Sequence, residues 1–204
     1  MGLLDEAVLE IASNRNMRFT WYAVIVVFGV SAILAVVFYR NIASSLLGQY
    51  FINETQQIKQ LANYVNVTGP LYVVLPVIIF AKNSLTDLIA YGLLVTLVAP
   101  IGVIIFNGGF LGFVTAITLP YHGNVLVEFY LLAPHGVIEI PAFSLTVASI
   151  SLLRKGVDYM YFKGFSLFLV SLVMLLVAAV FESTVTIGAG ALVGLITSHA
   201  MGVT

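Results

Sequence analysis

Long apolar runs separated by short polar stretches dominate the chain. The clearest is "WYAVIVVFGVSAILAVVF", 18 uncharged residues between Arg18 and Arg40. At about 1.5 Å per residue, a helix of this length approaches the roughly 30 Å of a bilayer's hydrocarbon core. The runs that predict membrane spans are 21–38, 71–81, 85–106, 135–153, 164–181 and 184–200. The pattern predicts an all-α fold, a polytopic transmembrane helical bundle of about five to six spans.

Three segments fit this pattern less well than the rest. As a helix, residues 71–81 cover only roughly 16 Å, so their crossing needs residues from the 58–70 stretch. Residues 107–134 mix glycines with apolar residues and predict a broken or re-entrant segment. Such irregular backbone survives at membrane depth only when protein covers it. The run at 184–200 is short and rich in small residues.

Two further segments show the spacing of amphipathic helices. In residues 44–66, apolar residues recur every three, four or seven positions among polar ones, which predicts a helix outside the hydrocarbon. Those residues are Leu47, Phe51, Ile58, Leu61 and Val65. Residues 1–14 also align their apolar residues on one face, which predicts an interfacial helix. Packing of that face on the protein itself is the alternative, and the sequence leaves both open.

The basic residues predict the orientation of the bundle, because Lys and Arg concentrate on the cytoplasmic side. With a cytoplasmic N-terminus, six of the eight face the cytoplasm: Arg15, Arg18, Lys82, Arg154, Lys155 and Lys163. Arg40 and Lys59 face outward. Since no repeat or long linker divides the chain, we expect residues 1–204 to form a single integral membrane domain of the cell membrane, with a family-like core at 70–183.

Composition supports the membrane assignment. The chain is 61% hydrophobic and 8% charged, and its mean hydropathy is +1.09, whereas globular chains carry about 25% charged residues. The net charge of −1 provides no field that would attract nucleic acid, so membrane lipids are the expected surroundings. The absence of cysteine excludes disulfides, thiolate nucleophiles and cysteine-ligated metals.

Polar residues within "LLAPHGVIEIPAFSL" form the main candidate site. His135 and Glu139 are four residues apart and share one helix face, and Pro141 should kink the helix just beyond them. In the predicted topology, Asn107 ends the third span and Glu182 ends the fifth, at the same outer layer. We therefore predict an intramembrane polar cluster of Asn107, His135, Glu139 and Glu182, which His122 and Glu128 could join.

Three interpretations of this cluster remain open. It could be a polar clamp that locks helices together, because buried polar groups are stable when they satisfy one another. It could be a site that handles a proton or a solute. A metal site is the third interpretation, although no HExxH motif or second nearby histidine is present. No serine lies beside a base, so we predict neither catalytic residues nor a metal or other cofactor.

Small residues predict where helices approach closely. The packing candidates are Gly108, Gly112, Gly136, Pro141, Gly190 and Gly194, of which two pairs have the Gly-xxx-Gly spacing. Asn83, in "FAKNS", is a possible additional site residue, but a helix cap is its more common role. The sequons at Asn53 and Asn66 are glycosylation candidates and suggest an external face.

Four motifs in order, "FAKNS", "FNGGFLG", "PHGVIEIPAF" and "AAVFES", resemble the stage II sporulation protein M family of small bacterial and archaeal membrane proteins. The resemblance covers about residues 70–183. The matching positions are Asn83, Asn107, Gly108, Pro134, His135, Gly136, Glu139, Pro141, Ala142 and Glu182. Lys82 departs from the pattern, which has Asn or a small polar residue there. The resemblance implies a membrane scaffold and no enzymatic activity.

The expected function is therefore a non-enzymatic, structural or partner-organising membrane protein. We expect it to form a homo-oligomer or to bind other membrane proteins. The alternative is a permease-like transport subunit or small carrier, with a proton or solute site at His135, Glu139 and Glu182.

Overall fold

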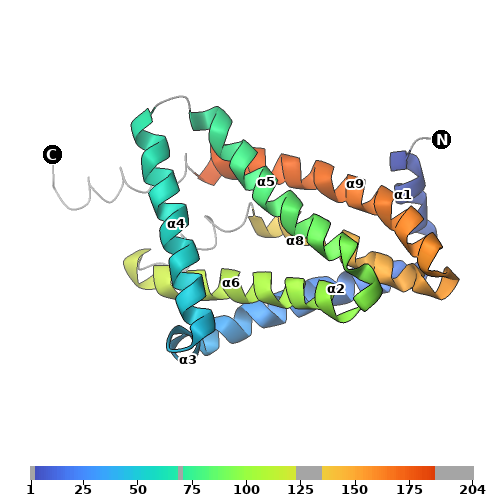
Figure 1. Ribbon diagram of the computed structural model, residues 1–204, viewed down its shortest axis with the longest axis horizontal. Coiled ribbons are helices and arrows are strands. Elements are labelled where there is room, and N and C mark those ends of the chain that lie inside the picture. Colours follow the sequence, from blue (N-terminus) through green and yellow to red (C-terminus); the bar gives the residue numbers. More distant parts are fainter. Residues whose placement is uncertain (1–2, 69–70, 123–134, 187–204) are drawn as a thin grey trace.

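The computed structural model describes residues 3–68, 71–122 and 135–186 (Figure 1). Every regular element in this part of the chain is helical, which confirms the prediction of an all-α fold. The elements are α1 (Leu3–Ser13), α2 (Arg15–Val37), α3 (Tyr39–Ala43), α4 (Leu46–Thr68), α5 (Leu71–Gly92), η1 (Leu94–Thr96), α6 (Val98–His122), η2 (His135–Glu139), α8 (Ile140–Ala148), η3 (Ser149–Lys155), α9 (Val157–Phe181) and η4 (Glu182–Thr186).

Within these residues, four helical segments are long and apolar enough to cross a membrane. They are Arg15–Val37, Val98–Ile117, Val137–Lys155 and Val157–Thr184. Their outward faces carry many large apolar side chains, of which Val26, Ile33 and Val173 are all more than half exposed. A continuous apolar surface of this kind requires lipid around it. The prediction of a membrane protein is therefore confirmed.

The long helices run along one axis and α4 lies across them. In Figure 1, α2, α5, α6, α8 and α9 extend along the long dimension, and α4 crosses one end of the bundle. α5 packs against α9 and runs in the opposite direction. The end that carries α1 is called the N-terminal end below, and the opposite end is called the α4 end.

α8 is the central helix of the bundle. All residues from Ala142 to Ala148 are buried, and α8 contacts α2, α5, α6 and α9. Pro141 has no N–H for the carbonyl of Val137, and the π-helical turn η2 directly precedes it. Pro141 also joins two helices, because the indole Nε1 of Trp21 on α2 donates to its carbonyl at 3.0 Å.

Glycines allow α2 and α6 to pack more extensively than any other pair of elements in the described residues. A Cβ on Gly108 would overlap the hydroxyl of Ser31 and the carbonyl of Phe28, and a Cβ on Gly112 would overlap the backbone of Ala32. The backbones therefore touch along this seam, as small-xxx-small spacing allows. Gly108 and Gly112 thus pack within the chain, on α2.

The helix boundary expected near residues 82–84 is wrong. Lys82 and Asn83 lie inside α5, which is continuous from Leu71 to Gly92, and the turn falls at 93–97. Asn83 consequently caps no helix. The polar residues need no loop because α4 covers their side of the helix and Glu54 pairs with Lys82. In the turn itself, Leu97 has φ 57°, a left-handed conformation that is rare for a residue with a Cβ.

The span expected at 85–106 is accordingly replaced by α6, which begins at Val98 and continues without interruption to His122. The glycine-rich start of the predicted broken segment is therefore regular helix, and two of its glycines, Gly108 and Gly112, pack on α2. Residues 123–134, the remainder of that segment, lie outside the described part of the chain, as does most of the candidate span at 184–200.

The two predicted amphipathic segments are both helical. α4 confirms the helix predicted at 44–66, and its Phe51 and Thr55 are buried against the bundle. α1 packs on α9, and Ile11 contacts the buried cluster around Met17 and Met160. Ile11 therefore packs on the protein itself, which is one of the two alternatives that the sequence left open for the apolar face of α1.

Candidate functional site

The predicted polar cluster is distributed over several elements. Glu139 lies in η2 and Glu182 in η4, and both of these π-helical turns pack against α9. Both carboxylates have interaction partners. Gly136 lies in η2. The side chains of His122 and His135 lie outside the described part of the chain, as do Glu128, Gly190 and Gly194 and the side chain of Asn66.

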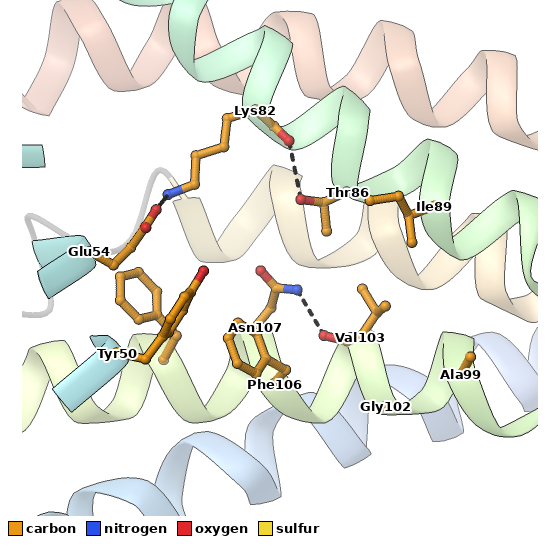
Figure 2. Close-up of a pocket in the computed structure, with 11 residues that line it drawn as sticks. Tyr50, Glu54, Lys82, Thr86, Ile89, Ala99, Gly102, Val103, Phe106 and Asn107 are labelled. Carbon is orange, nitrogen blue, oxygen red and sulfur yellow. Dashed lines mark hydrogen bonds and ion pairs between the residues drawn. The ribbon is translucent and has the colours of Figure 1, made fainter. Parts of the chain in front are cut away.

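Asn107 lies within α6, where it faces a groove. Its Nδ2 donates to the carbonyl of Val103 within α6 at 2.8 Å. It lines a groove of about 410 Å³ between α4, α5 and α6 (Figure 2). The groove is lined by Tyr50, Glu54, Lys82, Thr86, Ile89, Ala99, Gly102, Val103, Phe106, Asn107 and Phe110. No residue of η2 or η4 belongs to this lining. We call this feature the α4–α5–α6 groove.

One end of the α4–α5–α6 groove is charged. The Nζ of Lys82 on α5 lies 2.5 Å from Oε1 of Glu54 on α4, with 49% and 23% of the side chains exposed. The ammonium also lies 5.7 Å from the ring centroid of Phe110, within the range of a cation–π contact. This ion pair fixes the transverse helix α4 against α5. Lys82, which departs from the family pattern, thus makes a contact between two consecutive helices.

Aromatic rings fasten the same end of the molecule. Phe51 of α4 is 1% exposed and packs against Phe106, Phe110 and Phe113 of α6 at centroid distances of 5.3, 5.3 and 5.5 Å. Edge-on and tilted ring pairs at these distances are favourable. The aromatic cluster positions α4 so that Tyr50, on its exposed side, reaches the groove.

A second polar site lies in the centre of the bundle and was missed from sequence. Asp87 of α5 is 0% exposed, and Oγ1 of Thr146 on α8 donates to its Oδ2 at 2.9 Å. Among the described residues, neither its Oδ1 nor the hydroxyl of Ser171 on α9 has a hydrogen-bond partner. The signal was a carboxylate in the apolar run "LTDLIAYGLLV", since ionisable residues at membrane depth are rare.

The N-terminal end has an electrostatic contact of its own. Asn14 donates to Glu10 at 2.9 Å, and the ammonium of Lys155 lies 3.5 Å from the same carboxylate. Burial alone would raise the pKa of Glu10, but the hydrogen bond from Asn14 and the charge of Lys155 together hold that pKa below its usual value. Tyr159 of α9 also donates to Glu10. These contacts tie α1 to the start of α9.

Two further observations concern metal binding and glycosylation. Among the described residues, no group of three or more His, Asp and Glu side chains could hold a metal ion. Asn53, one of the two glycosylation candidates, is exposed on α4. The main features of the described residues are the α4–α5–α6 groove and the buried hydrogen bond between α5 and α8.

The sequence of the described bundle matches a known family. The model of stage II sporulation protein M matches residues 14–187. The chain belongs to the stage II sporulation protein M family. The match extends from α2 to η4 and beyond it by one residue. It therefore includes the first span and α4, which the resemblance over 70–183 had left out. No curated protein and no solved structure matches the chain.

Proposed function

We propose that the protein is a non-enzymatic membrane scaffold that organises further copies of itself or other membrane proteins. Membership in the stage II sporulation protein M family and the four apolar helical segments support a membrane role. Within this role, a scaffold requires helices that keep fixed positions relative to one another, so that the surface presented to a partner does not change.

The contact between Asp87 and Thr146 carries this proposal. Both side chains are 0% exposed, so the hydrogen bond joins α5 to α8 without contact with water. A carrier instead opens its polar site to each side of the membrane in turn. A hydrogen bond to a buried carboxylate in a low-dielectric core is strong, so the bond from Thr146 to Oδ2 of Asp87 favours one arrangement of α5 and α8. The closed contact at the centre of this bundle therefore favours a scaffold over a carrier.

Assembly in native membranes tests the proposal. Full-length protein is extracted into nanodiscs from native membranes, and its stoichiometry is measured by mass photometry together with the proteins that copurify. We expect a defined oligomer or a partner present in fixed stoichiometry. Strictly monomeric protein with no partner in fixed stoichiometry would contradict the proposal.

The transport alternative is tested with Glu139→Gln, which keeps the size of the side chain but removes its titratable proton. A scaffold retains its assembly in this variant, and neither the parent nor the variant drives pH-dependent solute flux in proteoliposomes. Flux in the parent that the variant loses would support a proton-coupled carrier and contradict the scaffold.

We further propose that the N-terminal end faces the cytoplasm. Five of the eight basic residues lie at this end: Arg15, Arg18, Arg154, Lys155 and Lys163. Lys82, which was expected on the same side, lies instead against Glu54 of α4. The chain has no cysteine, so single cysteines can report the orientation. With an impermeant maleimide on intact cells, Asn53→Cys should be labelled at once and Ser13→Cys only after permeabilisation. The reverse pattern would contradict the proposed orientation.

A further inference from the structure

The α4–α5–α6 groove changes in polarity along its length. Figure 2 shows Glu54, Tyr50 and Lys82 at one end, and Gly102 and Ala99 toward the other. This is the profile of an amphiphile, which has a polar head and an apolar tail. Because α6 contains a membrane span, a molecule in the groove lies partly at membrane depth. A membrane lipid is therefore the ligand class that matches this gradient.

The groove as a whole is comparable in size to pockets that hold small ligands. Its total volume of about 410 Å³ lies within the range of pockets that hold small ligands. A Cβ placed on Gly102 would meet nothing within 4 Å, so the wall of the groove is open at this point of α6. Ile89 of α5 and Val103 of α6 contribute apolar side chains to the same lining.

The polar end carries one charge of each sign. Both Lys82 and Glu54 are partly exposed, and their ion pair bridges α5 and α4 at the edge of the groove. A zwitterionic headgroup complements this arrangement, because its phosphate can face Lys82 while its ammonium faces Glu54. A purely anionic headgroup could face Lys82 but would offer no positive group to the neighbouring Glu54 carboxylate. The hydroxyl of Tyr50 provides a further hydrogen-bonding group at this end.

We propose that the α4–α5–α6 groove binds one membrane phospholipid with a zwitterionic phosphate–ammonium headgroup. Lys82 and Glu54 bind the headgroup, and one hydrocarbon chain lies along Ile89, Val103 and Gly102. The bound lipid fills the space between the transverse helix α4 and the α5–α6 pair, so that it becomes part of the surface that the bundle presents at the α4 end.

The first experiment measures lipid binding by the full-length protein and tests the site proposed for the hydrocarbon chain. Native mass spectrometry measures the affinity for phosphatidylethanolamine and for phosphatidylglycerol added in detergent. Gly102→Leu fills the groove and should weaken phosphatidylethanolamine binding by about tenfold or more. Gly109→Leu is the matched control, because it adds the same side chain to the same helix where a Cβ also meets nothing within 4 Å. It should bind within about twofold of the parent. Equal binding by both variants would overturn the assignment.

A second experiment tests the headgroup site and does not depend on whether Gly102→Leu folds. The parent should prefer phosphatidylethanolamine to phosphatidylglycerol, and the double variant Lys82→Gln, Glu54→Gln should lose this preference. Equal binding of both lipids by the parent would overturn the headgroup assignment. Disulfide crosslinking of Ile89→Cys between two copies in nanodiscs would place a second chain in the groove instead, and would overturn the lipid proposal.

Discussion

Replacing Gly112 by alanine tests the close approach of α6 to α2. The new Cβ would overlap the carbonyl oxygen of Ala32, which belongs to the backbone of α2 and cannot rotate away. Gly109→Ala is the control, because a Cβ at that position meets nothing within 4 Å. Both changes replace glycine by alanine within α6, so they share the same gain in helix propensity.

The magnitude follows from two opposing effects. Extra volume in a packed interface costs about 1–3 kcal/mol, and we expect about 3 kcal/mol where the obstacle is backbone. The propensity gain is about 1 kcal/mol for either variant. The free energy of unfolding should therefore fall by about 2 kcal/mol in Gly112→Ala and rise by about 1 kcal/mol in Gly109→Ala. The resulting difference of about 3 kcal/mol corresponds to roughly 6–12 °C in Tm for a chain of this size.

The assay is unfolding in mixed micelles followed by the fluorescence of the single tryptophan. Trp21 bridges α2 and α8 through its hydrogen bond to Pro141, so its emission reports separation of the central helices. If Gly112→Ala and Gly109→Ala unfold within about 0.5 kcal/mol of each other, a difference smaller than the overpacking range, the close approach of α2 and α6 is wrong.

Three further contacts yield predictions for the same protein. Thr146→Val removes the donor to buried Asp87 and should lower the free energy of unfolding by about 1–3 kcal/mol. Thr146→Ser keeps the hydroxyl and should lower it by less. Equal losses in the two variants would contradict the hydrogen bond. Trp21→Phe removes the donor to Pro141 and should cost about 0.5–1.5 kcal/mol by circular dichroism, and an unchanged stability would argue against this contact. The folded-state pKa of Glu10 is lowered, so its contribution to stability is present above the usual glutamate pKa and is lost as pH falls through the folded pKa. Acid titration of unfolding should therefore become flatter in Glu10→Gln, and an unaltered pH profile would contradict this electrostatic role.

Local sequence pattern was sufficient for the membrane class and for most of the helices. The run at 21–38 predicted α2 because no charged residue interrupts it. Pro141 predicted a kink just past Glu139, and the π-helical turn η2 ends at Glu139. The spacing of apolar residues at 44–66 predicted α4. These features depend on residues within a few turns of one another, so they are readable without the fold.

Sequence pattern failed where a polar residue is stabilised by a distant helix. Lys82 and Asn83 suggested a helix boundary, yet α5 continues through them and Lys82 pairs with Glu54 of α4. Asp87 was not predicted as a site residue, yet its hydrogen bond with Thr146 joins α5 to α8 in the core. Glu54 and Thr146 both lie too far along the chain from the residues that they contact for a local pattern to include them.

The sequence by itself determined that this chain lives in lipid, that it is helical, and that its glycines permit close packing, because these properties follow from composition and short-range periodicity. Only the tertiary structure decided which polar groups meet, where α5 ends and which helices enclose a groove. The reason is physical: a polar group within a membrane is tolerated only when another element satisfies it, and the identity of that element depends on how the whole bundle packs.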